Sequence, residues 1–239
     1  MIVLRSLVFN IAFYGWTACL CLALWWVPLL PRPAVMAVVH WYLRTVSRLE
    51  RTVIGLRYEV RGREYLPAGP CLVAAKHQSA WETLKLHLLL PDPAVVLKRE
   101  LTRLPVWGWF AVKAGMIPVD RGARGRALAS LLAGARQVVA EGRPIVIFPQ
   151  GTRTAPGTHH PYRIGVGMLY EQLHLPIVPM ALNSGLYWPR RAFLKRPGTI
   201  VVEFLPPIQP GLDRHQAMHE LEARLEAATD RLVAEAAAG

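Results

Sequence analysis

The sequence contains few cysteines. Its 239 residues include only Cys19, Cys21 and Cys71, and no Cys-x-x-Cys pair is present. Three cysteines cannot close a disulfide framework, and the absence of paired cysteines argues against a structural zinc site. We therefore expect three reduced thiols packed as small apolar side chains, as in a protein of a reducing compartment.

Charged residues, and acidic residues above all, are also scarce. Asp, Glu, Lys and Arg make up 18% of the chain, below the ~25% of an average soluble domain. The 28 Lys and Arg outnumber the 16 Asp and Glu, which leaves a formal net charge of +12, and 53% of the residues are hydrophobic. This composition excludes a disordered polyelectrolyte. A basic, apolar chain suits an anionic lipid surface or an anionic substrate as much as nucleic acid.

The longest stretch without an ionised side chain lies near the N-terminus, at residues 6–31. As a helix it would rise ~39 Å, more than the ~30 Å hydrocarbon core of a bilayer. Pro28, Pro31 and Pro33 are expected to break this helix. A cleaved signal peptide is the alternative interpretation, but the stretch is longer than a normal signal core.

A second candidate helix follows from residue 34 to about residue 51. It is apolar at first and then carries Arg44, Arg48 and Arg51. We predict that residues 1–54 form a membrane-anchoring two-helix segment, a hairpin that dips into a bilayer or lies on it, with a full span by the first helix left open. The arginines favour a cytoplasmic location for the rest of the chain.

Beyond residue 55, short apolar runs alternate with helical stretches. This alternation predicts an α/β fold at residues 55–239, with a mostly parallel sheet of about seven strands flanked by helices. The expected strands are 57–61, 71–75, 94–98, 116–119, 144–148, 177–182 and 199–204. The expected helices are 79–90, 104–114, 124–141, 165–173 and 213–236. In such folds the chemistry gathers beyond the carboxyl ends of the strands.

A histidine and a glutamate follow the second expected strand. His77 comes at its end and Glu82 five residues later. Residues five apart on one helix do not face each other, so the two can meet only if His77 precedes the helix and Glu82 lies in its first turn. A carboxylate on one imidazole N–H fixes the tautomer and leaves the other nitrogen to accept a proton. Ser79 and Glu82 equally fit a capping box, which would only satisfy backbone donors.

The strand at 144–148 ends in a polar turn that contains Gly151, Thr152 and Arg153. Glycine lets the backbone approach a ligand closely, and a guanidinium fork suits phosphate. Taken alone, this turn would be interpreted as solvated surface. Together with the other polar strand ends it becomes a candidate anion-binding turn.

Two further strand ends carry cations, and no metal motif accompanies them. Arg121 follows the strand at 116–119, and Lys98 ends the strand at 94–98. The adjacent His159 and His160 do not form a chelating helix pair, so no metal site is expected. No Ser or Cys lies in a recognisable nucleophile elbow, so the sequence does not predict a covalent enzyme intermediate.

Together these segments resemble the four ordered blocks of the 1-acylglycerol-3-phosphate acyltransferases, over roughly residues 55–210. The blocks are His-Gln-Ser-Ala-Trp-Glu at 77–82, Gly-Met-Ile-Pro-Val-Asp-Arg at 115–121, Phe-Pro-Gln-Gly-Thr-Arg at 148–153 and Ile-Val-Pro-Met-Ala-Leu at 177–182. Two positions depart from the family pattern. Glu82 stands where the family usually has Asp, and Gln150 stands where it usually has Glu.

The resemblance implies transfer of a fatty acyl group from an acyl-CoA or acyl carrier protein thioester to the sn-2 hydroxyl of lysophosphatidic acid, giving phosphatidic acid. It places the protein on membrane lipids at the cytoplasmic face of the bacterial inner membrane, anchored by residues 6–50, with no cofactor beyond the thioester co-substrate. His77 would remove the hydroxyl proton and Glu82 would orient the imidazole. The implied acceptor-binding residues are Gln150, Gly151, Thr152, Arg153, Arg121 and Lys98.

Three alternatives remain at this point. Because Gln150 is uncharged where the family usually has Glu, near Arg153, another lysolipid acceptor, such as a lyso-ornithine lipid, remains open. A non-catalytic membrane protein that binds anionic lipid through its +12 charge is the second alternative. A nucleic-acid binder fits less well, because the basic residues lack a groove-reading helix or an aromatic stacking motif.

Overall fold

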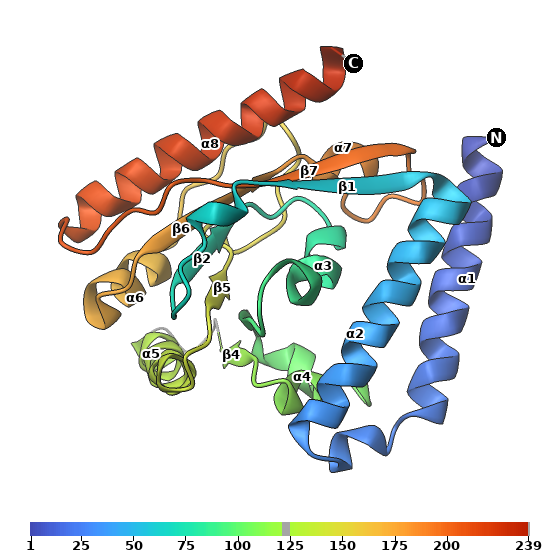
Figure 1. Ribbon diagram of the computed structural model, residues 1–239, viewed down its shortest axis with the longest axis horizontal. Coiled ribbons are helices and arrows are strands. Elements are labelled where there is room, and N and C mark those ends of the chain that lie inside the picture. The colour runs from blue at the N-terminus through green and yellow to red at the C-terminus, as the bar shows by residue number, and fades with distance from the viewer. Residues whose placement is uncertain (121–124, 239) are drawn as a thin grey trace.

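The structure, a computed structural model, is built on a seven-stranded sheet that has helices on both faces (Figure 1). It describes residues 1–120 and 125–238. The strands lie in the order β1-β7-β6-β2-β5-β3-β4. They are β1 (Leu56–Arg61), β2 (Leu72–Ala75), β3 (Ala94–Lys98), β4 (Ile117–Val119), β5 (Ile145–Ile147), β6 (Ile177–Leu182) and β7 (Gly198–Phe204).

Most of the sheet is parallel. Strands β6, β2, β5, β3 and β4 run in one direction, whereas β7 is antiparallel to β6, and β1 runs with β7. The predicted α/β fold with about seven strands is confirmed, and each strand lies within one residue of its predicted limits. The prediction worked because strands that are buried on both faces are short, continuous apolar runs.

The helices account for the remaining layers. They are α1 (Ile2–Ala23), α2 (Arg32–Leu49), α3 (Trp81–Leu89), α4 (Trp107–Lys113), α5 (Gly125–Ala140), α6 (Gly165–Leu173), α7 (Ser184–Tyr187) and α8 (Arg214–Ala238). Helix α7 was not predicted, because four residues are too few to show a helical period. The helices expected at 79–90, 104–114, 124–141, 165–173 and 213–236 are α3, α4, α5, α6 and α8, each within three residues of its predicted limits.

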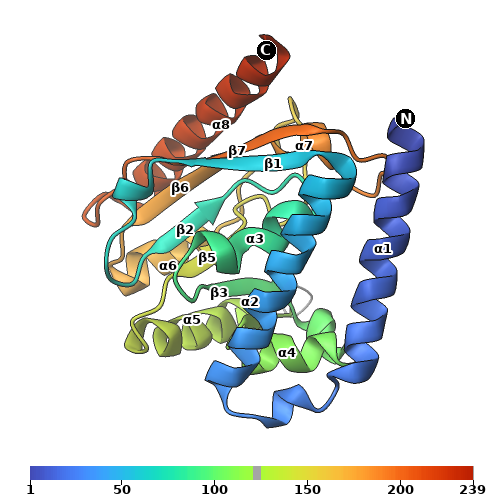
Figure 2. The same cartoon turned by 45° about the vertical axis from the view of Figure 1, so that its right-hand side comes forward.

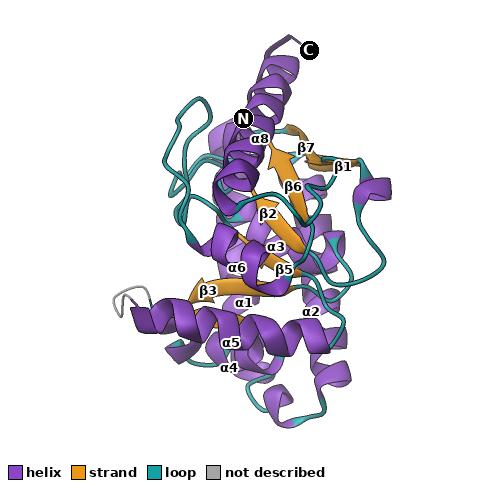
Figure 3. Ribbon diagram, turned by 90° about the vertical axis from the view of Figure 1, so that its left-hand side faces the viewer, coloured by secondary structure: helices purple, strands orange, loops and turns teal. Residues whose placement is uncertain are grey.

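Helices cover both faces of the sheet (Figure 3). Alternate side chains of the strands enter two separate apolar cores, one on each face. Leu72 and Ala74 of β2 belong to the core beneath α5, α6 and α8. Val73 and Ala75, which point the other way, belong to the core that contains α3 and the buried part of α1. This period of two is the property of a strand that lies between two helical layers.

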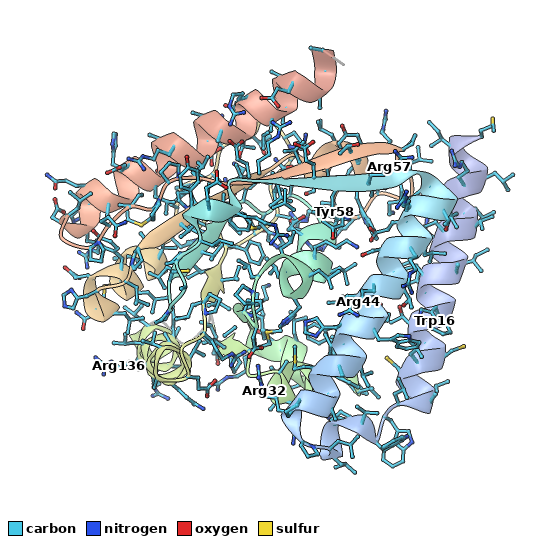
Figure 4. The ribbon with its side chains drawn as sticks, in the orientation of Figure 1. Trp16, Arg32, Arg44, Arg57, Tyr58 and Arg136 are labelled. Carbon is cyan, nitrogen blue, oxygen red and sulfur yellow. The ribbon has the colours of Figure 1, made fainter. Side chains whose placement is uncertain are left out.

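Helices α1 and α2 run side by side as a hairpin (Figures 1 and 2). Trp16 of α1 lies between them (Figure 4), and its Nε1 donates to Oγ1 of Thr45 at 3.3 Å. At the start of α1, the fully buried Phe9 packs edge-on against Trp188, with 5.3 Å between ring centroids. The hairpin is therefore anchored to the rest of the protein at its amino-terminal end.

The first helix differs from its predicted limits. It spans Ile2–Ala23, whereas the charge-free stretch runs from residue 6 to residue 31 and was expected to be broken by its prolines. It begins before Arg5 because Nε of this residue is satisfied within the protein, donating to the carbonyl of Val53 at 2.8 Å. It ends at Ala23 because the ring of Pro28 would clash with the carbonyl of Leu24, four residues earlier.

The second helix starts earlier than predicted, at Arg32 rather than at residue 34. Pro33 lies in its first turn, where a missing N–H costs nothing because that donor has no partner within the helix. Arg32 reaches across to Asp92, with 2.6 Å between Nη2 and Oδ1 (Figure 4).

Helix α1 is the one helix in the described part of the chain that is long and apolar enough to cross a membrane. Only 11% of its most apolar window is buried inside the structure. Its apolar side chains are thus left for another apolar medium, although a signal sequence near an N-terminus meets the same criteria of length and composition.

Candidate active site

The candidate site lies where three neighbouring parallel strands end. Strand β2 pairs with β5 on one side and with β6 on the other, all in the same direction. Lys76 and His77 follow β2, Phe148 follows β5, and Asn183 and Ser184 follow β6. Because parallel strands end at one edge of a sheet, polar residues from segments far apart in the sequence meet there.

His77 and Glu82 form a hydrogen-bonded pair. Nδ1 of His77 lies 2.8 Å from Oε1 of Glu82. The Glu82 side chain is fully buried, and that of His77 is 14% exposed. The predicted geometry is therefore present: His77 lies before α3 and Glu82 lies in its first turn.

Glu82 also serves the start of the helix, as the alternative interpretation expected. Oε1 accepts hydrogen bonds from the backbone amides of Gln78 at 2.8 Å and Ser79 at 2.7 Å. Oγ of Ser79 accepts from the amide of Trp81 at 3.0 Å. One carboxylate oxygen thus binds two backbone donors and the imidazole, so helix capping fixes the direction in which the carboxylate faces His77.

Ser184 holds the second oxygen of this carboxylate. Its hydroxyl donates to Oε2 of Glu82 at 2.8 Å, and its side chain is fully buried. The sequence analysis missed Ser184. The signal that could have found it is the polar Asn-Ser-Gly run directly after the fourth block, which is the same pattern of strand end and polar turn that identified His77.

The imidazole is also fixed from its other side. Its ring stacks on Phe148, with 4.0 Å between centroids and 23° between planes. The carbonyl of His77 accepts a hydrogen bond from the amide of Thr154 at 2.8 Å, and the hydroxyl oxygen of Thr154 lies 3.3 Å from the same carbonyl oxygen. A carboxylate at Nδ1 favours the tautomer with its proton there, so Nε2 has a free lone pair. Nε2 makes no hydrogen bond with any residue that the structure describes.

The turn after β5 brings an arginine to the same edge. Gly151 has φ of 69°, a left-handed conformation that favours glycine, and its amide donates to the carbonyl of Phe148 at 2.9 Å. Thr152 is exposed and Arg153 is half-buried. Nε of Arg153 is buried, and no hydrogen-bond acceptor reaches it within the described residues. Such a donor is suited to an anion that enters from outside.

Gln150 is directed inward. It is buried, its Oε1 accepts from the hydroxyl of Thr154 at 3.1 Å, and its Nε2 lies 3.4 Å from Oε1 of Glu226 in α8. The structure therefore places Gln150 behind the turn, in contact with protein groups.

The other two predicted cations are farther from the pair or outside the described residues. Lys98 is exposed at the carboxyl end of β3. Because β5 lies between β2 and β3, the two strands are separated by two strand spacings, about 10 Å. Lys98 thus shares the edge without contacting the His77–Glu82 pair. Arg121 lies outside the described residues.

Across residues 1–120 and 125–238, no group of three or more His, Cys, Asp or Glu is placed to hold a metal ion. His159 instead pairs with Glu226, with Nδ1 3.0 Å from Oε2. The site thus consists of an oriented imidazole with a free nitrogen and an unpaired guanidinium donor at one edge of the sheet. This arrangement can take a proton from a hydroxyl of an anionic molecule.

Comparisons with known proteins find relatives among the acyltransferases. The acyltransferase family profile matches residues 57–183. The chain is 37% identical over 209 residues to a 1-acyl-sn-glycerol-3-phosphate acyltransferase of Pseudomonas aeruginosa, covering 87% of this chain and 81% of that protein. It is 31% identical over 205 residues to the alpha form of this enzyme from Mus musculus, covering 84% and 71%.

A solved structure has the same fold. The crystal structure of a 1-acyl-sn-glycerophosphate acyltransferase from Thermotoga maritima superposes with a TM-score of 0.80 over 98% of each chain, at 18% sequence identity.

Proposed function

The chain belongs to the acyltransferase family, and from this premise we propose that it transfers a fatty acyl group to the sn-2 hydroxyl of 1-acyl-sn-glycerol 3-phosphate, giving phosphatidic acid. The donor is a thioester of coenzyme A or acyl carrier protein, and no other cofactor takes part. The names of the Pseudomonas and mouse relatives support this acceptor. The observation that carries the proposal is the His77–Glu82 pair, with its free Nε2 at the edge that also presents Arg153.

His77 acts as the general base. Its Nε2 takes the proton of the acceptor hydroxyl as that oxygen attacks the thioester carbonyl carbon. Glu82 stabilises the imidazolium that forms, and Ser184 holds Glu82 in place. The tetrahedral intermediate then expels the thiolate, which takes the proton from His77. Because a thiolate leaves readily, positioning and proton transfer supply the catalysis without a covalent enzyme intermediate.

Arg153 binds the phosphate of the acceptor. Its guanidinium has a buried donor without an acceptor among the described residues, and Gly151 and Thr152 lie beside it. Lys98 at the same edge and Arg121 after β4 add positive charge. Gln150 faces the interior, so its lack of charge does not alter the part of the turn that faces the acceptor. This position favours lysophosphatidic acid over a lyso-ornithine lipid.

The protein associates with a membrane, where its acceptor resides. Residues 1–54 form the anchor for the catalytic domain at 55–239, and residues 6–50 contact the cytoplasmic face of the bacterial inner membrane. Apolar side chains of the hairpin and of α4 are exposed, and Arg44, Arg48 and Arg51 follow the apolar part of α2, as in segments that remain cytoplasmic. They include Leu22, Trp25, Trp26, Leu29, Trp107, Trp109 and Val112.

The deciding experiment compares the wild type with His77→Ala in transfer assays. Each is given acyl-CoA or acyl carrier protein thioester together with lysophosphatidic acid or lyso-ornithine lipid. We expect transfer to lysophosphatidic acid by the wild type, and a kcat about 10²–10⁴-fold lower for His77→Ala. Binding to anionic vesicles should be equal. His160→Ala, a change at an exposed histidine, is the matched control.

Other outcomes would overturn the mechanism, the acceptor or the enzymatic function. Undiminished turnover by His77→Ala would refute the general-base mechanism. Transfer only to the lyso-ornithine lipid would replace the acceptor. If the wild type binds vesicles but transfers no acyl group to either acceptor, the non-catalytic lipid-binding function would be supported instead.

A further inference from the structure

A carboxylate on α8 joins the two strand ends that carry the site. Oε1 of Glu226 accepts hydrogen bonds from Nζ of Lys76 at 2.7 Å, the hydroxyl of Tyr162 at 2.7 Å and Nε2 of Gln150 at 3.4 Å. Oε2 lies 2.5 Å from Nζ of Lys76 and 3.0 Å from Nδ1 of His159. Figure 1 shows the loop after β5 (yellow) passing beneath α8 (red).

Lys76 makes this carboxylate necessary. The Lys76 side chain is 2% exposed and that of Glu226 is 12% exposed. An ammonium group removed from water needs a nearby anion, and loss of one partner leaves a buried charge uncompensated. Lys76 directly precedes His77, and its own amide donates to the carbonyl of Met180 in β6 at 2.9 Å. Glu226 therefore holds Lys76, the residue that links the end of β2 to His77.

The same carboxylate holds both ends of the loop that carries Arg153. Gln150 lies before the arginine and Tyr162 after it. Burial, followed by the adjoining Glu226 carboxylate, raises the pKa of Tyr162, so this hydroxyl remains a donor at neutral pH. Thr154 joins the loop to the base, because its hydroxyl donates to Gln150 and its amide to the carbonyl of His77. A shift at Glu226 would thus move the imidazole and the guanidinium together.

We propose that Glu226 is a positioning residue for the acyl transfer: its carboxylate neutralises Lys76 and sets the distance between the base and the anion-binding turn. This inference rests on the proposed function. It also accounts for the neutral side chain at position 150. A glutamate there would place a second carboxylate next to Glu226, with only Lys76 to neutralise both. One negative charge is enough to neutralise Lys76, and Glu226 of α8 supplies it.

A charge exchange tests the proposal. Glu226→Gln leaves Lys76 without a counterion, and Gln150→Glu crowds two carboxylates. For each single variant we expect the acceptor KM to rise and kcat to fall, each by about tenfold, with a smaller change in the donor KM. The double variant Q150E/E226Q keeps one carboxylate beside Lys76. It should recover kcat/KM for the acceptor to within about threefold of wild type.

Hydrogen exchange supplies a readout that does not depend on activity. Peptides that cover residues 150–163 should exchange faster in Glu226→Gln and return toward the wild-type rate in the double variant. Glu222→Gln, at an exposed glutamate one turn earlier on α8, is the matched control.

The proposal would be overturned if the acceptor KM and the exchange rate of Glu226→Gln equal those of wild type. It would also be overturned if kcat/KM of the double variant is no higher than that of the less active single variant. A fall in kcat with every KM unchanged would show that Glu226 does not move the anion-binding turn, and it would also count against the proposal. Absence of transfer by the wild type would refute the proposed function instead, and the exchange measurement would still decide whether Glu226 holds the loop.

Discussion

At the scale of the residue, the two oxygens of Glu82 have different partners. Oε1 binds the imidazole and two backbone amides, whereas Oε2 binds the hydroxyl of Ser184. Oε1 is therefore held by the local chain, from His77 to Glu82, and Oε2 by the first residue of α7, which follows β6. The carboxylate keeps a single orientation because both of its oxygens are bound.

Replacement of Ser184 by alanine tests whether the hydrogen bond to Oε2 is needed to orient Glu82. The change leaves a buried carboxylate oxygen without its donor, and such a loss costs about 1–3 kcal/mol. Because Ser184 acts on the base through Glu82, we expect kcat to fall about tenfold while the acceptor KM stays within about twofold. Steady-state kinetics with lysophosphatidic acid would measure both. Ser130→Ala on α5 is the control, and an unchanged kcat in Ser184→Ala would show that Glu82 needs no second support.

The limits of sequence prediction at this site follow from distance along the chain. His77 and Glu82 were predictable because five residues of local geometry bring them together. Ser184 and Glu226 contribute from 102 and 150 residues beyond the groups they bind, Glu82 and Lys76. Glu226 is one of several charges on a long helix, and only the packing of α8 against the sheet directs it toward Lys76.

At the scale of the element, the contact between α2 and α3 holds the hairpin against the catalytic helix. Nζ of Lys85 in α3 lies 2.8 Å from Oε2 of Glu50, at the end of α2, and Nε1 of Trp81 donates to the same oxygen at 3.2 Å. Burial raises the pKa of Glu50 and lowers that of Lys85. Long-range contacts also accompany the helix limits: Arg32, the first residue of α2, pairs with Asp92, which a local pattern of prolines does not reveal.

His87 gives this contact a pH dependence. Burial, with the adjacent His40, Arg143 and Arg32 and against an opposing effect of Asp92, lowers the pKa of His87 to about 4. Both ring nitrogens lack hydrogen-bond partners among the described residues. The unfolded chain therefore binds this proton first, from pH ~6.5 downward. The stability that depends on neutral His87 is complete above pH ~6.5 and is lost as the pH falls toward 4, by roughly 3 kcal/mol in total.

The measurement is thermal unfolding in detergent between pH 7.5 and 4.5. We expect the wild-type Tm to fall more steeply with acid than that of His87→Leu, since the variant has no such proton to bind. His215→Leu, at an exposed histidine of α8, should follow the wild type. Equal pH dependence in wild type and His87→Leu would show that His87 does not contribute.

At the scale of the whole molecule, the exposed apolar surface continues from the hairpin to the active-site edge. The chain passes from Lys98, at the end of β3, into the turn Arg99–Arg103 and then into α4. Leu101 and Leu104 between them are exposed, as are the tryptophans of α4. The strand ends that would bind the acceptor thus lead directly to side chains suited to the membrane interface.

Substitution of surface residues tests membrane contact better than truncation does. Removal of residues 1–50 would also remove Phe9 from the core and Glu50 from its ion pair with Lys85, so a truncated chain would lose stability together with its anchor. The exposed turn between α1 and α2 avoids this difficulty, because Trp25, Trp26 and Leu29 are 55%, 45% and 80% exposed. Changing all three to serine removes apolar surface and leaves Val27, the buried residue of this turn, in place. We expect about tenfold weaker binding to anionic vesicles in sedimentation assays, with an unchanged Tm. Leu212→Ser, at an exposed leucine before α8, should bind as the wild type does, and undiminished binding by the triple variant would show that this turn does not enter the membrane.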